Sequence, residues 1–279
     1  MTREDAAPAD ALAGAVYAPA WRVVIAALRV WSRAGLLLVA ALVVLGSDVD
    51  MTPLVLFRAV AVAAALPALA AWLLEQAFAA RLVRDGTRLV AHARGRRVEI
   101  PLDAVAEAVP WQVPLPGPGV TLRLHAGPSL AVALDDPGAL LALLGADPYR
   151  PIVRWAAARA RARRAGWYRP LVRFALFGLV PGAILFRTHQ WIAYGGTFGQ
   201  YYLLGLRAYL GTFLIYWATV TLYLVLWSNP WRLVAEAVTL VGAWAAPADV
   251  TALRHRVERG YALSYYGGAL LVLLLRLLP

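Results

Sequence analysis

The chain has 279 residues, of which 61% are hydrophobic and 15% are charged, and its mean hydropathy is +0.63. Soluble globular proteins have an apolar share of about 45–50%, so this composition predicts an integral membrane protein. The chain contains no cysteine, which excludes disulfides, thiolate nucleophiles, cysteine-ligated zinc and iron–sulfur clusters.

The formal charge of +11 has a local origin. Eleven arginines and no acidic residue lie between Asp147 and Glu236, and the other sixteen basic residues balance the sixteen acids. Arginine-rich segments beside transmembrane helices are typical of the cytoplasmic face. We therefore expect anionic inner-leaflet lipids as partners and no nucleic acid. All 27 basic residues are arginine, which indicates the coding bias of a GC-rich bacterium and hence a bacterial inner membrane.

The N-terminal region predicts a tail followed by a membrane hairpin. Residues 1–20 are acidic and precede the first apolar run, whereas a cleaved signal peptide begins with basic residues. We expect residues 1–20 to form a cytoplasmic tail. Residues 21–76 predict a transmembrane hairpin whose two apolar runs are joined by a short acidic link, with Arg33 snorkelling to the headgroups.

Residues 78–146 predict a small β-rich domain. Short alternating segments are separated by turn residues, which is typical of antiparallel hairpins. Asp136 is a suitable N-cap and Pro137 a suitable first residue for a closing helix that runs through Leu144. The expected strands cover residues 81–83, 88–93, 97–102, 104–113, 119–125 and 129–134.

Three features of this segment resemble a known family. They are the phrase at 98–105, the glycine and proline run at 114–119, and the closing helix that follows Asp135-Asp136-Pro137. Together they resemble bacterial pleckstrin-homology-like (PH-like) domains over residues 78–146. The resemblance implies a cytoplasmic PH-like domain inserted between membrane helices, and it implies no catalytic residues.

Residues 147–169 predict a basic interfacial linker helix that lies along the inner leaflet. Its arginines extend into the start of the next apolar run. We expect seven of them to contact lipid headgroups or a partner: Arg154, Arg159, Arg161, Arg163, Arg164, Arg169 and Arg173.

Residues 170–279 predict a C-terminal transmembrane bundle. Its spans are expected at 170–186, 203–227 and 261–278, with an outer loop at 191–202 and a stop at Ser228-Asn229-Pro230. Residues 231–246 are too short for a span of about 20 residues, and crossing there would place three following arginines outside. We therefore prefer an interfacial or re-entrant helix. The fold class is an α-helical polytopic membrane protein with five spans, or six if 231–246 crosses.

A few polar residues are candidates for chemistry. Arg187, His189 and Arg207 flank the expected outer loop, where they suit an anionic headgroup and a general base. The competing interpretation is an aromatic belt with snorkelling arginines. The four histidines are expected at different depths, so we expect neither a haem nor a metal, and no cofactor. Glu75 and Glu236 are expected to pair with Arg232 or Arg81.

These patterns favour a non-enzymatic inner-membrane accessory, assembly or scaffold subunit. It would dock a protein or lipid partner through the PH-like domain, and its other partners would be membrane protein subunits. The alternative is a membrane enzyme or carrier that acts on an anionic lipid-like substrate at the outer surface. In that alternative, His189, Arg187 and Arg207 carry the site.

Overall fold

The computed structural model describes residues 12–46, 52–93, 96–163 and 171–277. They fall into two compact units. The sheet unit takes its residues from Met1–Ser32, Ala65–Arg161 and Val238–His255. The helical unit takes its residues from Arg33–Ala64, Ala162–Ala237 and Arg256–Pro279.

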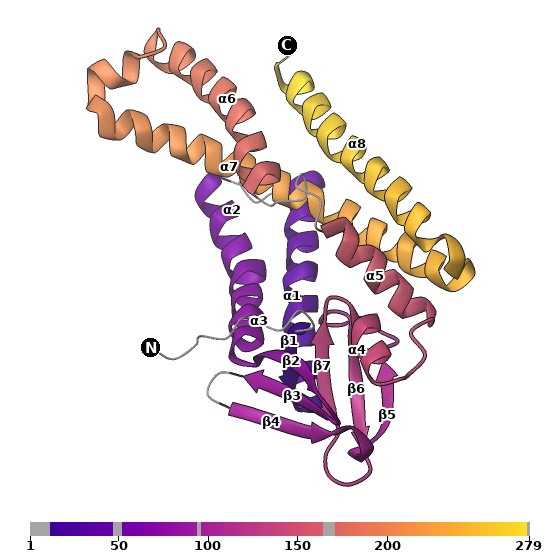
Figure 1. The fold of residues 1–279 in the computed structure, drawn as a ribbon. Coiled ribbons are helices and arrows are strands. Elements are labelled where there is room, and N and C mark those ends of the chain that lie inside the picture. The colour runs from indigo at the N-terminus through magenta and orange to yellow at the C-terminus, as the bar shows by residue number, and fades with distance from the viewer. Residues whose placement is uncertain (1–11, 47–51, 94–95, 164–170, 278–279) are drawn as a thin grey trace, which may run out of the picture. The chain divides into compact units, whose positions relative to one another are not determined.

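Seven antiparallel strands form one curled sheet in the sheet unit (Figure 1). Their order across the sheet is β4-β3-β2-β1-β7-β6-β5. The strands expected between residues 78 and 146 are confirmed as β2 to β7. The bounds are β1 Leu12–Tyr17, β2 Ala79–Asp85, β3 Arg88–Ala93, β4 Arg96–Pro101, β5 Val105–Pro110, β6 Gly119–Leu124 and β7 Leu130–Leu134.

The central strand of this sheet comes from the segment that we expected to be an N-terminal tail. Within β1, Gly14 is paired with Ala80 of β2 on one side and with Leu134 of β7 on the other. Ala15 and Tyr17 are buried. The tail expectation does not describe residues 12–17, because a six-residue apolar strand completes the hydrogen bonds of two strands that would otherwise be edges.

The membrane hairpin is inserted between β1 and β2. Helix α1 (Pro19–Val44) begins two residues after β1 ends, and helix α3 (Leu66–Ala77) ends two residues before β2 begins. Helix α2 (Pro53–Val60) and a π-helical turn (Ala61–Ala65) complete the second arm. The Arg29 guanidinium donates two hydrogen bonds to the Glu75 carboxylate, which joins the two arms near the sheet. Glu75 therefore pairs with Arg29 and not with Arg81 or Arg232.

Two helices close the core of the sheet unit. Helix α4 (Pro137–Leu143) is capped by the Asp136 carboxylate, which accepts a hydrogen bond from the Gly138 N–H as the sequence predicts. Helix α5 (Pro151–Arg163) lies in the expected linker, and it packs its apolar face into the core. The buried side chains of α5 in this core are Ile152, Val153, Trp155, Ala156 and Ala158.

The helical unit contains α6 (Phe177–Tyr194), which follows a π-helical segment (Leu171–Leu176), and parts of α7 (Gly199–Ala245) and α8 (Val250–Leu277). The expected outer loop at 191–202 is largely helical: α6 continues to Tyr194, α7 starts at Gly199, and a non-helical Gly205 with a φ of +81° divides α7 into a short and a long part. The packing of α6 on α7 is close: a Cβ at Gly182 would meet the backbone of Trp217 at 3.0 Å.

The expected stop at Ser228-Asn229-Pro230 is wrong, because the part of α7 that follows a break at Gly205 continues through it. Proline removes one backbone donor and bends a helix without ending it where neighbouring groups supply other bonds. Ser228 and Asn229 are buried, and both are bonded. The Ser228 hydroxyl bonds the Tyr261 hydroxyl, and Asn229 exchanges two hydrogen bonds with Arg33. Arg33 is thus bound to the bundle.

Four helices in the described ranges are long and apolar enough to cross a membrane. They are Pro19–Val44, Pro53–Ala77, Leu171–Tyr194 and Gly199–Ala245. The chain therefore has the helices of a multi-pass membrane protein. The segment expected as a fifth span, 261–278, belongs largely to α8, which is not among these four.

The centre of the sheet predicts the first test. A Cβ at Gly14 would overlap the carbonyl oxygen of Ala133 and the side chain of Leu134. We expect Gly14→Ala to lower the free energy of unfolding by about 1–3 kcal/mol. Denaturant unfolding of the purified full-length protein measures this. Ala13→Val, at an exposed site on the same strand, is the control, and an equal loss in both variants would contradict the close packing.

Candidate functional site

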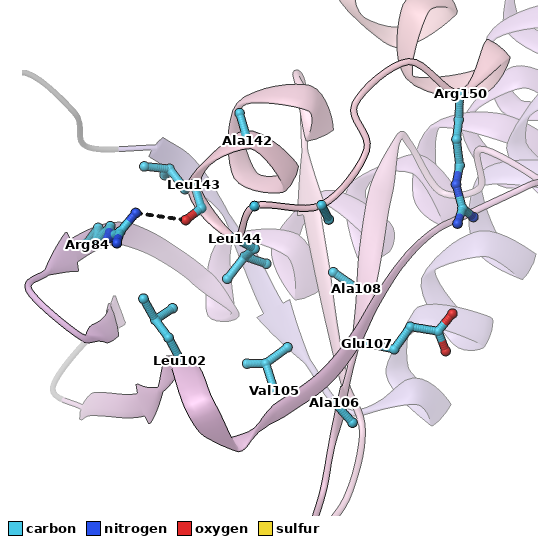
Figure 2. Close-up of a pocket in the computed structure, with 12 residues that line it drawn as sticks. Arg84, Leu102, Val105, Ala106, Glu107, Ala108, Ala142, Leu143, Leu144 and Arg150 are labelled. Carbon is cyan, nitrogen blue, oxygen red and sulfur yellow. Dashed lines mark hydrogen bonds between the residues drawn. The ribbon is translucent and has the colours of Figure 1, made fainter.

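The sheet unit has an open hollow of about 540 Å³ beside edge strand β5. Residues of β5 form one wall, and the end of α4 with the turn that follows it forms the other. Figure 2 shows Arg84 and Arg150 at opposite ends of the hollow. The lining residues are Arg84, Leu102, Val105, Ala106, Glu107, Ala108, Ala142, Leu143, Leu144, Gly145, Ala146 and Arg150.

Strand β5 presents unpaired backbone groups to this hollow. The Trp111 N–H donates to the Gly119 carbonyl of β6. Because hydrogen-bonded residues alternate along an antiparallel strand, the backbone N–H and C=O of Val109 and Glu107 point toward β6 and those of Ala108 point away from it. The register shifts between Val105 and Glu107, which makes Ala106 a bulge residue. Among the described residues, no other strand pairs with β5 on its outer side. The N–H and C=O of Ala108 are therefore available to a ligand.

The opposite wall is held in place by a well-formed helix end. The Ala146 N–H donates to the Leu141 carbonyl and the Gly145 N–H to the Ala142 carbonyl, with Gly145 at a φ of +69°. This is the glycine-terminated pattern that satisfies the last carbonyls of a helix. The Arg84 guanidinium donates to the Leu143 carbonyl at 3.0 Å (Figure 2). The hollow therefore has two ordered walls.

The charge at the hollow is positive. Glu107 is paired with Arg123 at 2.9 Å, which offsets its charge. Arg84 is committed to carbonyl oxygens, which leaves its charge uncompensated. In the described part of the chain, no side chain bonds the Arg150 guanidinium. Two arginine charges therefore favour an anionic ligand.

The other edge strand of the sheet, β4, differs in character. Glu99 accepts from Arg88 at 2.7 Å and lies 2.9 Å from Arg97. The hydrogen bond from Arg88 holds the pKa of the Glu99 carboxyl below its usual range, with a further contribution from the Arg97 charge. Charged side chains protect an edge strand from pairing. On β5, Glu107, Pro110 and the bulge at Ala106 limit pairing, and Ala108 keeps an outward N–H and C=O.

The seven arginines that we expected to contact lipid headgroups or a partner lie in different environments. The Arg154 guanidinium lies over the Tyr149 ring at 5.4 Å and that of Arg159 over Trp155 at 5.3 Å. Arg161 and Arg163 are exposed, whereas Arg173 is buried in the helical unit. Arg164 and Arg169 lie outside the described residues.

The three residues of the alternative outer site lie on α6, which carries Arg187 and His189, and on α7, which carries Arg207. Arg187 and Arg207 are exposed, and the His189 ring lies 5.3 Å from the ring of Tyr216 and 5.9 Å from that of Tyr194. No hydrogen bond, ion pair or ring contact in the described ranges joins Arg187, His189 and Arg207 to one another.

Two neighbouring glutamines form the buried polar network of that region. The Gln190 amide donates to the Gln200 side-chain oxygen at 2.7 Å, and the Gln200 amide donates to the Thr212 hydroxyl at 2.8 Å. Both glutamines are buried. Neither glutamine is among the three residues predicted for the outer site, and the pair ties α6 to α7.

The helical unit also holds a buried ionic cluster. Arg232 pairs with Glu236 at 2.8 Å and with Glu258 at 2.9 Å, so the expected Glu236–Arg232 pair is confirmed. The Arg173 guanidinium lies 4.2 Å from the Tyr261 ring centroid, and the Tyr265 hydroxyl donates to the Arg173 carbonyl. The part played by Glu258 and Arg173 was not predicted, because it depends on how α8 packs.

Neither unit offers a metal centre within the described residues, since no three His, Asp or Glu side chains are grouped for one. Comparison of the chain with protein-family models, with curated proteins and with solved structures finds no match. The geometry and charge of the hollow, a groove open along β5, make it the candidate site.

The glutamine network predicts a stability effect. Gln200→Met leaves the buried Gln190 amide without its acceptor, which costs about 1–3 kcal/mol. We expect this variant to unfold at a lower fraction of sodium dodecyl sulfate than the wild type when the detergent is titrated into mixed micelles. Gln112→Met, at an exposed glutamine, is the control. Unfolding of the Gln200 variant at the wild-type midpoint would contradict the network.

The ionic cluster predicts a larger effect. Arg232→Met removes the guanidinium that neutralises two carboxylates, one of which, on Glu258, is only 4% exposed. Loss of one partner of a buried ion pair costs about 3–5 kcal/mol. The same detergent titration measures it, with Arg259→Met at an exposed arginine as the control. A matching small change in both variants would contradict a structural role for the cluster.

Proposed function

We propose that this chain is a non-enzymatic accessory, assembly or scaffold subunit of a membrane complex, which docks a partner protein along β5. The partner contributes an extended acidic segment that adds to the sheet as a further strand. The observation that carries the proposal is the open groove between the unpaired edge of β5 and the ordered end of α4.

The shape of the groove supports a protein segment over a lipid. Strand addition needs backbone donors and acceptors at a strand spacing of about 4.8 Å. The outward N–H and C=O of Ala108 supply one such pair, and the small side chains of Ala106 and Ala108 line the open hollow. The charges of Arg84 and Arg150 favour acidic side chains on the added strand.

We also propose that the sheet and α4 form a PH-like domain. The resemblance of residues 78–146 is supported by the antiparallel meander of β2 to β4 and β5 to β7 and by the closing helix. In this proposal the domain includes β1, so the membrane hairpin 21–76 is an insertion within it.

The proposed location is the bacterial inner membrane, with the N-terminus and the sheet unit in the cytoplasm. The arginine excess after Asp147 supports this orientation. We propose five spans, in which the C-terminal half of α8 is the fifth. We propose that Arg161 and Arg163 contact anionic lipids of the inner leaflet, which their exposure supports.

The test uses Ala108→Pro and Arg150→Glu in the tagged full-length protein, purified from host membranes in mild detergent. Proline removes the outward N–H of residue 108 and spares the bonds to β6, and edge strands tolerate it. We expect each variant to lose a co-purifying protein at least about tenfold, which corresponds to about 1.4 kcal/mol. Quantitative mass spectrometry of the eluates measures the loss.

Arg97→Glu is the matched control, since it makes the same charge change on the opposite edge strand β4. A partner that is lost from both groove variants and retained by Arg97→Glu supports strand addition. A partner retained by Ala108→Pro contradicts it, provided that the variant unfolds at the wild-type temperature. Loss of a defined lipid without loss of any protein would also contradict it.

A further inference from the structure

Where α1 meets the sheet, the sheet unit exposes apolar side chains. In the β5–β6 loop, Val113 is 60% exposed and Leu115 is 37% exposed. In the first turns of α1, Trp21, Val23 and Val24 are 42%, 67% and 42% exposed. Leu115 and Val23 line one hollow together, so the two sets are adjacent. Exposed apolar side chains that lie next to one another mark a candidate interaction surface.

The loop is fixed against the helix by one arginine. The Arg22 guanidinium donates to the carbonyls of Leu115 at 3.2 Å and Val113 at 3.3 Å. The same guanidinium lies 3.9 Å from the ring centroid of Trp111, whose indole N–H donates to the Thr121 hydroxyl. The apolar side chains of the loop are therefore held level with the first turn of α1, which defines their height along the helix axis.

That height is the N-terminal end of α1, which begins at Pro19, and the C-terminal end of the second candidate span, which ends at Ala77. Each of the two helices contains an apolar window long enough to cross a membrane. Phe78, which follows Ala77, contacts the Trp21 ring at 5.6 Å and the Tyr17 ring at 5.9 Å. Tryptophan and tyrosine concentrate at the boundary between acyl chains and headgroups. The loop lies beside this aromatic group.

We propose that the β5–β6 loop and the first turns of α1 form an apolar collar immersed in the lipid headgroup–acyl boundary. The occupant of this surface is lipid, because the collar continues the apolar, exposed surface of α1 and lies at the level where the candidate spans end. The partly buried Arg22 is committed to the loop, so apolar contact dominates there. This proposal does not depend on the groove beside β5.

The chain contains no cysteine, so one introduced cysteine carries a label at a single site. Val113→Cys and Leu115→Cys, each labelled with bimane, are reconstituted as full-length protein in vesicles of phosphatidylethanolamine and phosphatidylglycerol. Thr87→Cys, in the exposed β2–β3 turn, is the aqueous control. Leu38→Cys, exposed on the apolar part of α1, is the membrane control.

We expect iodide to quench both loop labels several-fold less than the label at residue 87. We also expect lipids that carry a shallow spin label to quench both loop labels. Iodide quenching of either loop label equal to that at residue 87 would overturn the collar. Protection from iodide without quenching by spin-labelled lipid would also overturn it, because a protein surface would then cover the loop. Neither readout depends on partner binding at β5.

Discussion

A strand in the middle of a sheet forms backbone hydrogen bonds with a neighbour on each side. In this sheet that strand is β1 (Leu12–Tyr17), which pairs with β2 and with β7. Without it, β2 and β7 would each present an open edge, and buried Tyr17 would leave the cluster that it forms with Phe78 and Trp111. Burial of this ring also raises the pKa of the Tyr17 phenol. The core of the sheet unit, the placement of α4 and the groove beside β5 all depend on this strand.

The helical unit depends on a second constraint, which is that buried charge must be paired. Its helices carry Arg173, Arg232 and Glu258 at buried or partly buried positions, and each is bonded to or stacked on a neighbour from another helix. Such contacts add little to stability over an apolar core, but they specify which helix faces meet. Polar residues of membrane helices commonly have this role.

The sequence was most informative where the determinants are local. Alternation and turn residues located β2 to β7, and Asp136 with Pro137 located α4, because caps and turns act over a few residues. Strand β1 was missed because its partners lie more than sixty residues away in the chain. The groove beside β5 was missed for the same reason, since its walls meet only in the folded sheet. The sequence wrongly predicted that the helix ends at Pro230. The hydrogen bonds of the buried neighbours Ser228 and Asn229 depend on other helices and cannot be read from the sequence.

The insertion of the hairpin between β1 and β2 orders the events of synthesis. The ribosome makes β1 first, then both arms of the hairpin, and β7 much later. The sheet cannot close around β1 until β7 has been made, because β7 is the second neighbour of β1. Closure over so long a separation is intrinsically slow. Strand β1 therefore lacks one of its two hydrogen-bonding neighbours for as long as both arms of the hairpin and the strands before β7 are being made.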